Sequence, residues 1–329
     1  MISFYYLFFL TYKFVIIIMV SFMEKQINEI FLNTCKQNNI KKHKIYLDYL
    51  KCKQKINFQE YLKMHFYELS ASKRKEVLTS KENTKLINLL NPFEQRYLII
   101  SKGEFYHRFD KFIKRDWLLL DDKNSEEFRL FIKSRDHIFV PRAGNQDSTV
   151  LNLSNENEWQ LNQELINTHH YIIEEVVKHH KIFDEITTKS LVTVKFITLL
   201  NNNSVYLLGS YLNIPKEKSK YYIPINLKTG KTINKAICNY LETDKIDDYQ
   251  VKELEIPKWD EVIKLLKEIP LIVKNLRYIS WEIAITNDDI ILMSASDEPD
   301  CYILQHPIYL KNHQGLSRKI NNILQGEIK

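Results

Sequence analysis

Residues 278–299 decide the fold of this chain, and they read YISWEIAITNDDIILMSASDEP. Two runs rich in β-branched and apolar residues flank a short Asn-Asp-Asp turn, which predicts a β-hairpin. Side chains two apart on a strand share a face, so we expect Glu282 to lie opposite Ser294 and Ser296. Oxygen ligands that converge from adjacent strands suit a hard cation such as Mg²⁺, although this trio contains a single carboxylate.

The composition describes a globular protein with room for one large or two ordinary domains, since 44% of the 329 residues are hydrophobic and 27% are charged. The net charge of +6 comes from lysines interleaved with 41 acids along the whole chain, so no nucleic-acid partner is expected. The sequence has neither a Walker A nor a G-x-G-x-x-G pattern, which excludes a Gly-rich phosphate loop. Its four cysteines form no C-x-x-C pair, so reduced thiols and a cytoplasmic location are expected.

Residues 1–22 differ from the rest of the chain, because they are almost wholly apolar apart from Lys13 and a few hydroxyl residues. As a helix they would span roughly 33 Å, about the thickness of a bilayer core. A signal peptide is disfavoured, since there is no basic segment at the start and no small-x-small cleavage site. Two interpretations stay open: an inner-membrane anchor, or sequence upstream of a true start at Met23, where an ordinary amphipathic helix begins.

The remaining sequence changes from helical to strand-forming patterns along its length. Residues 23–90 carry apolar residues at three-and-four spacing between Lys-rich faces and predict a helical N-terminal region. Asn91-Pro92 predicts a boundary, because the residue before a proline is pushed out of the α region. Helices and then strands follow in 91–175 and 176–329, which we expect to be the two lobes of an α+β fold.

The hairpin resembles the metal-binding end of the sugar-transfer-associated ATP-grasp family, which is related to alpha-L-glutamate ligases. That family carries G-W-D-x-A-I-T and then L-I-E-G-N, where this chain has SWEIAIT at 280–286 and LMSAS at 292–296. Its I-P-x-W segment is matched by IPKW at 256–259. The resemblance extends from about Asn91 to the C-terminus and implies a two-lobed ATP-grasp-like fold.

The resemblance also implies which residues hold ATP. Lys123, which follows Asp122 and precedes a helix, stands where the family places a lysine near the nucleotide. The strand Ile172–Glu175 resembles the hinge whose backbone holds adenine while an acid, here Glu174 or Glu175, reaches toward the ribose.

Two phosphate-binding segments of the family match less well. The V-K-P-x-D-G-S segment reads VPRAGNQ at 140–146, so the lysine is absent and Arg142 stands one position away. The S-V-N-T-I-R segment reads SLVTVK at 190–195, where Lys195 keeps the charge of the family's arginine without its bidentate fork. Arg142 and Lys195 are therefore the candidate catalytic residues and are expected to contact phosphate.

The metal ligands depart furthest from the family pattern. The family's Glu and Asn have become Ser294 and Ser296, which leaves Glu282 as the carboxylate of the metal set. Losing an anionic ligand weakens a Mg²⁺ site sharply, because this ion gives up its water shell reluctantly. ATP and Mg²⁺ are the cofactors that the resemblance implies.

Two functions follow from the resemblance. An intact site would use ATP to convert a carboxylate, free or linked to a sugar, into an acyl phosphate that an amine then attacks. A degenerate site would instead bind a nucleotide or a glycan as a partner of glycosyltransferases. Either function belongs to bacterial surface polysaccharide biosynthesis, and the choice depends on the substituted metal and phosphate ligands.

Overall fold

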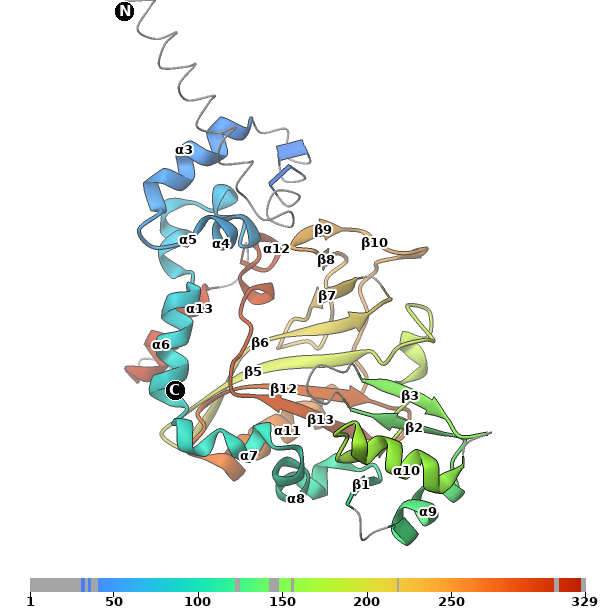
Figure 1. Ribbon diagram of the computed structural model, residues 1–329. Helices are drawn as coiled ribbons and strands as arrows, with labels where there is room; N and C mark the ends of the chain where they lie inside the picture. The colour runs from blue at the N-terminus through green and yellow to red at the C-terminus, as the bar shows by residue number, and fades with distance from the viewer. Residues whose placement is uncertain are drawn as a thin grey trace, which may run out of the picture.

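The computed structural model describes residues 31–32, 35–36, 41–121, 125–141, 148–154, 157–217, 219–310 and 314–326 (Figure 1). These residues form a helical N-terminal region, a four-stranded sheet and a seven-stranded sheet, together with a two-stranded ribbon. The fold is thus α+β, with two lobes preceded by helices, as predicted.

Side-chain caps define the helices of the N-terminal region. Asn57 accepts the backbone N–H of Glu60, and Thr79 and Glu82 form a reciprocal capping box, so the first turns of two helices have partners for their free N–H groups. The region has its own apolar core, in which Tyr61 is fully buried. The helices are α3 (Lys42–Cys52), α4 (Phe58–Lys63), α5 (Ala71–Glu76) and α6 (Ser80–Leu90).

The small sheet is antiparallel and has the strand order β1-β4-β2-β3. Two helices cover one of its faces, and Phe128 and Leu161 from these helices pack against Ile138 and Ile173 from the strands. The elements are β1 (Trp117–Leu119), α9 (Ser125–Lys133), β2 (His137–Val140), β3 (Thr149–Asn152), α10 (Glu158–Asn167) and β4 (Ile172–Glu175).

The large sheet has the strand order β13-β12-β5-β6-β7-β8-β9, and all its neighbouring strands are antiparallel. Its strands are β5 (Thr193–Asn201), β6 (Ser204–Pro215), β7 (Lys220–Pro224), β8 (Ala236–Cys238), β9 (Leu241–Thr243), β12 (Tyr278–Ile285) and β13 (Ile290–Ser296).

The remaining elements are α7 (Tyr97–Ile100), α8 (Lys102–Ile113), β10 (Lys245–Ile246), β11 (Tyr249–Gln250), α11 (Trp259–Glu268), α12 (Pro307–Leu310) and α13 (Leu316–Leu324), with short 3₁₀ turns between them.

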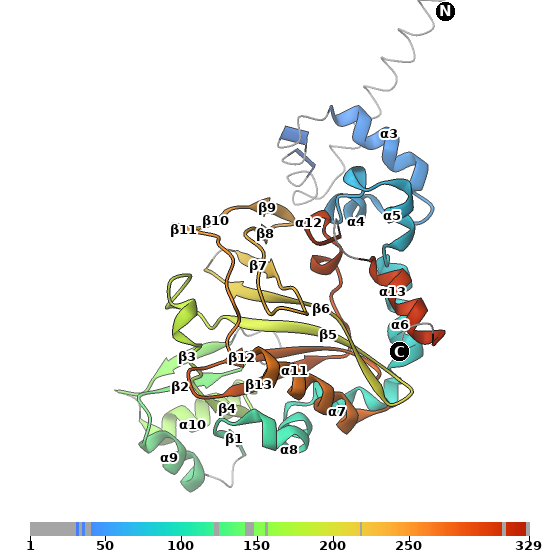
Figure 2. The same cartoon turned by 180° about the vertical axis from the view of Figure 1, so that it is seen from behind.

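The two faces of the large sheet are covered differently. Trp281 on β12 and Phe196 on β5 belong to the core that α8 and α11 complete, and Figure 2 shows α11 in front of this face. On the opposite face α6 and α13 cover Leu199 and Tyr278. Farther along that face the strand register places Glu282 beside Lys195, and the helices that the structure describes in this core do not cover this pair. The uncovered part of the sheet is where the candidate site lies.

The predicted hairpin is confirmed, with β12 and β13 joined by a turn that Thr286 stabilises by accepting the N–H groups of Asp288 and Asp289. Glu282 lies opposite Ser294, as expected. The register shifts directly after this pair, so one extra residue of β13 forms a bulge.

Asn91 ends α6 and fastens the helical region to the hairpin. Its side chain is completely buried, accepts the N–H of Tyr278 at 3.0 Å, and donates to the carbonyls of Tyr278 at 2.6 Å and Asp297 at 2.9 Å. A buried amide whose donors and acceptor are satisfied fixes the relative position of the two segments.

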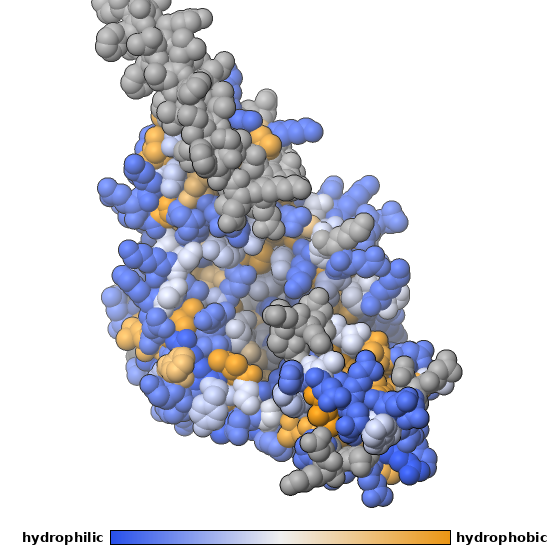
Figure 3. Space-filling view, viewed as in Figure 1, coloured by the Kyte–Doolittle hydropathy of each residue, from blue (hydrophilic) through white to orange (hydrophobic). Residues whose placement is uncertain are grey.

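No described helix is long and apolar enough to cross a membrane. The apolar stretch 1–22, predicted to be an anchor or an upstream extension, lies outside the described residues. On the face shown in Figure 3, hydrophilic residues predominate and hydrophobic ones form several separate groups.

A buried ion pair joins the two sheets. Arg115 follows α8, and its Nε donates to Glu174 Oε2 on β4 at 2.9 Å while its Nη1 donates to the carbonyl of Leu292 on β13 at 2.9 Å. The side chains of Arg115 and Glu174 are 1% and 2% exposed. A single guanidinium therefore bridges the small and the large sheet.

We expect Arg115→Met to lower the free energy of unfolding by about 3–5 kcal/mol, because removing one partner leaves the other charge buried and uncompensated. Denaturant unfolding followed by circular dichroism measures this loss. Lys102→Met is the matched control, since Lys102 contacts the other oxygen of Glu174 at 3.2 Å but is 43% exposed, and it should cost less than about 1 kcal/mol. Equal losses for the two variants would show that Arg115 does not join the sheets.

Candidate functional site

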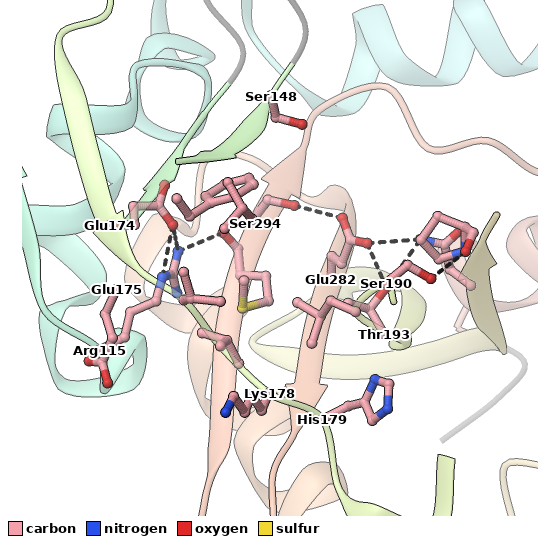
Figure 4. Close-up of a pocket in the computed structure, with 18 of the residues that line it drawn as sticks. Arg115, Ser148, Glu174, Glu175, Lys178, His179, Ser190, Thr193, Glu282 and Ser294 are labelled. Carbon is pink, nitrogen blue, oxygen red and sulfur yellow. Dashed lines mark hydrogen bonds and ion pairs between the residues drawn. The ribbon is translucent and has the colours of Figure 1, made fainter. Parts of the chain in front are cut away.

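A cavity of about 770 Å³ lies between the two sheets. Its walls come from β4, from the ends of β5 and β6, from β12 and β13, and from the connection between β4 and β5, residues 176–192, which we call the linker. Figure 4 shows Arg115 and Glu174 on one side of the cavity and Glu282, Ser294 and Thr193 on the other.

Glu282 on β12 is held by side chains from three other strands, β5, β6 and β13. Its Oε1 accepts hydrogen bonds from Thr193 Oγ1 at 2.6 Å and Asn213 Nδ2 at 3.1 Å, and its Oε2 accepts one from Ser294 Oγ at 3.1 Å. The ammonium of Lys195 lies 3.8 Å from Oε2. Both oxygens of the carboxylate are therefore occupied, and its charge is balanced by a lysine of the neighbouring strand.

Ser296 does not join this cluster. Although it lies on the same face of β13 as Ser294, its hydroxyl accepts the N–H of Glu298 at 3.2 Å and is 3.4 Å from the carbonyl of the same residue. Asp297, the next acid along the chain, lies 3.4 Å from Arg96, and burial raises the pKa of its carboxyl. Of the three predicted metal ligands, the structure brings Glu282 and Ser294 together.

The residues present do not fit a magnesium ion. Mg²⁺ requires near-octahedral oxygen coordination with carboxylate or phosphate charge. Here Glu282 is surrounded by two hydroxyls, an amide that points its NH₂ group at the carboxylate, and the ammonium of Lys195. Among the described residues there is no group of three or more His, Cys, Asp or Glu side chains arranged to hold a metal.

The two acids predicted to approach the ribose differ in their surroundings. Glu174 is 1% exposed and is bonded to Arg115, Lys102 and the hydroxyl of Tyr106. Glu175 is exposed at the cavity wall, where its Oε2 accepts the N–H of Asp116 at 3.1 Å. Of the two carboxylates, that of Glu175 faces the solvent.

Lys123 and Arg142, the other predicted contacts to ATP, lie outside the described residues. Lys195 is described. It is not one of the residues that line the cavity, but its ammonium lies 3.8 Å from Glu282, which does line it.

A histidine joins the two ends of the linker. The Nδ1 of His179 accepts the N–H of Val192 at 3.0 Å, so its proton is on Nε2, which lies 3.3 Å from Asp184 Oδ1. The His179 side chain is 7% exposed. The linker contacts the large sheet at the next residue, where the backbone N–H of His180 donates to the carbonyl of Ile285 on β12 at 2.6 Å.

Two lysines of the linker, Lys178 and Lys189, line the cavity. Both are exposed, and neither ammonium group has a hydrogen bond or ion pair with another described residue. In contrast, each acid of the wall has a partner: Glu174, Glu175, Asp184 and Glu282. The wall thus has four cations and four carboxylates, and the cations without a partner among the described residues are Lys178 and Lys189. Sequence analysis missed these lysines, and the signal that points to them is their place between the hinge strand and the next strand.

Two sheets that enclose a polar cavity, with a hinge strand on one side and a hairpin on the other, define an ATP-grasp-like protein. The sequence profile of the sugar-transfer-associated ATP-grasp family matches residues 155–325, just over half of the chain. The protein belongs to this family. No curated protein matches the sequence.

Several solved structures of ATP-grasp enzymes are similar to this chain. The ligase PsnB in complex with its precursor peptide PsnA2 and AMPPNP is 12% identical, with a TM-score of 0.43 over 75% of this chain and 70% of that protein. D-alanine–D-alanine ligase from Bacillus anthracis with ATP is 12% identical, with a TM-score of 0.42 over 78% and 76% of the two chains. The ADP complex of the N5-carboxyaminoimidazole ribonucleotide synthetase purK is 12% identical, with a TM-score of 0.43, and the match covers 68% of this chain but 51% of that one.

Restoring the family's metal ligands tests the geometry of the hairpin. We expect the double change Ser294→Glu and Ser296→Asn to make ATP bind at least about tenfold more tightly in Mg²⁺ than in EDTA, because a second carboxylate then faces Glu282. Calorimetric titration measures the ratio. Ser296→Asn alone is the control and should give no gain, since residue 296 is bonded within its own turn. An unchanged ratio in the double variant would contradict the assignment of Ser294 to the metal position.

Proposed function

We propose that this protein binds ATP in the cavity between its sheets without a metal ion, and that it works as a non-catalytic nucleotide-binding partner of glycosyltransferases in cytoplasmic steps of surface polysaccharide biosynthesis. The observation that carries the proposal is the charge distribution of the cavity. Each of its acids has a hydrogen bond or an ion pair with a protein group, whereas the ammonium groups of Lys178 and Lys189 have no partner among the described residues.

The linker offers a site for the adenine ring. Val176 and Val177 line the cavity, and their backbone groups have no hydrogen-bond partner among the described residues. Phe139 and Val150 of the small sheet and Met293 of the hairpin supply apolar surface around them. An apolar slot with a few free polar groups along one edge is a suitable environment for a planar, hydrogen-bonding ligand such as a purine.

The lysines offer a site for the triphosphate. A compact, strongly charged ammonium on a flexible chain binds phosphate as a point charge. With both lysines on the linker that also holds the base, the nucleotide would extend along the linker toward Lys189. Positive charge supplied by the protein would then replace the charge that Mg²⁺ supplies in phosphoryl-transfer enzymes.

The hydrogen bonds and the ion pair of Glu282 argue against catalytic turnover of ATP. Phosphoryl transfer from ATP needs metal ions that bridge the phosphates and neutralise the developing charge. In this site Glu282 is satisfied by three hydrogen bonds and by Lys195, and no second carboxylate faces it from Ser294. The family's association with sugar transfer supports a role beside glycosyltransferases rather than as one of them. The alternative, a Mg²⁺-dependent carboxylate–amine ligase acting on a carboxylate or sugar-linked substrate, rests on family membership.

The two linker lysines give the first test of the proposal. We expect Lys178→Ala and Lys189→Ala each to weaken ATP binding about fivefold, a loss of about 1 kcal/mol, because each removes one phosphate contact. Calorimetric titration of the full-length protein at low ionic strength measures the change. Lys181→Ala is the matched control, because Lys181 is exposed on the same linker but does not line the cavity, and it should leave binding within about twofold.

Equal effects of the three variants would mean that the lysines act only through net charge. This result would contradict the proposal that the cavity binds the phosphates of ATP. Phosphate release from ATP on adding Mg²⁺, abolished by Glu282→Gln, would instead support the ligase alternative.

A further inference from the structure

A second cavity of about 810 Å³ opens beside the first, and we call it the side cavity. The two cavities share a stretch of the linker that includes Asp184, Lys189 and Ser190. The side cavity then continues past the end of β6 to Tyr221 on β7 and to Asp247 in the turn between β10 and β11. A ligand there would lie next to the far end of the nucleotide cavity.

The wall of the side cavity carries hydroxyl groups together with side chains of both charges. Its hydroxyls come from Thr187, Thr188, Ser190, Ser219 and Tyr221. Its charged groups are Asp184, Lys189, Lys216, Glu217 and Asp247. Carboxylates accept hydrogen bonds, ammonium groups donate them, and hydroxyls do both, so the wall offers closely spaced donors and acceptors.

Part of this polar wall is held in place. The ammonium of Lys216 donates to the carbonyl of Ile186 at 2.7 Å and lies 3.1 Å from Asp247, which is 62% exposed. Ser190 donates to the carbonyl of Pro215 at 2.5 Å and lies 3.3 Å from the hydroxyl of Thr187. The groups that would orient a ligand are therefore fixed before it binds, which lowers the entropy cost of binding.

The same wall disfavours two other classes of ligand. A second phosphate or nucleotide would meet three carboxylates, against two ammonium groups of which one is already paired with Asp247. An apolar ligand would leave the hydroxyl and charged groups of the wall without partners, because nine of the eleven residues that line it, all except Pro215 and Tyr221, are polar or charged. An uncharged molecule that carries many hydroxyls satisfies both donors and acceptors.

We propose that the side cavity binds a sugar, as an uncharged pyranose unit of a glycan. The volume lies in the range of small-molecule sites and accommodates more than one sugar ring. Lys189, which lines both cavities, is placed to contact the sugar and the nucleotide phosphates together. This inference rests on the proposed function and adds the class of ligand that the protein would hold beside ATP.

Saturation-transfer NMR on the full-length protein tests the inference, with methyl α-D-glucopyranoside, methyl β-D-galactopyranoside and N-acetylglucosamine as probes at millimolar concentration. We expect transfer to at least one of the probes and loss of at least half of the signal in Asp247→Asn. Asparagine tolerates the positive φ of 50° at this turn position, so the variant keeps its fold. Asp248→Asn is the matched control, because Asp248 is exposed in the same turn but does not line the cavity, and it should leave the signal unchanged.

Titration with ATP on the same samples separates the two proposals. ATP binding that persists in Asp247→Asn, together with a lost sugar signal, supports both. ATP binding without transfer to any probe, or with transfer that Asp247→Asn and Asp248→Asn affect equally, overturns the sugar site and leaves the nucleotide proposal standing. Sugar binding without ATP binding overturns the nucleotide proposal alone.

Discussion

The buried contact between Arg115 and Glu174 sets the position of the small sheet on the large one, and the cavity between them depends on it. The guanidinium satisfies an acid of β4 and carbonyls of β13 at once. A charge buried in this way is costly unless every donor and acceptor has a partner, so the arrangement leaves little freedom in how the sheets meet. The linker that follows β4 then crosses the open part of the large sheet, where the backbone N–H of His180 bonds to Ile285 of β12 and His179 bonds to Val192, just before β5.

The chemistry of the cavity follows from how its charges are paired. In a site that holds Mg²⁺, carboxylates must remain available to the ion. Here Glu282 is bonded to Thr193, Asn213 and Ser294 and stands beside Lys195, so a hydrogen-bond network occupies the place of a metal site. This network satisfies the carboxylate of Glu282 by itself, since both of its oxygens accept hydrogen bonds. The free positive groups lie on the linker instead, which favours binding of an anion over activation of one.

The sequence predicted the hairpin and the pair Glu282 and Ser294, because strand alternation and a short Asn/Asp turn fix side-chain direction locally. It did not predict that Ser296 would turn to the backbone of Glu298, since this depends on how the strand ends. Nor did it predict that Glu174 would be buried against Arg115, a residue 59 positions away whose role emerges only in the tertiary fold.

The linker lysines were missed for a different reason. Residues 176–192 have neither helical nor strand periodicity, so no rule of spacing assigns Lys178 or Lys189 a direction. Their importance comes from where the two flanking strands place the segment, which is a property of the sheet arrangement.

We have proposed that the cavity binds ATP with positive charge from the protein in place of a metal ion. Calorimetric titration of the full-length protein with ATP, first in EDTA and then in excess Mg²⁺, is the decisive measurement. We expect binding in EDTA to be at least as tight as binding in Mg²⁺, because Mg²⁺ neutralises phosphate charge that would otherwise attract the lysines. Binding that appears only when Mg²⁺ is present would contradict it and would restore the metal-dependent ligase as the better description.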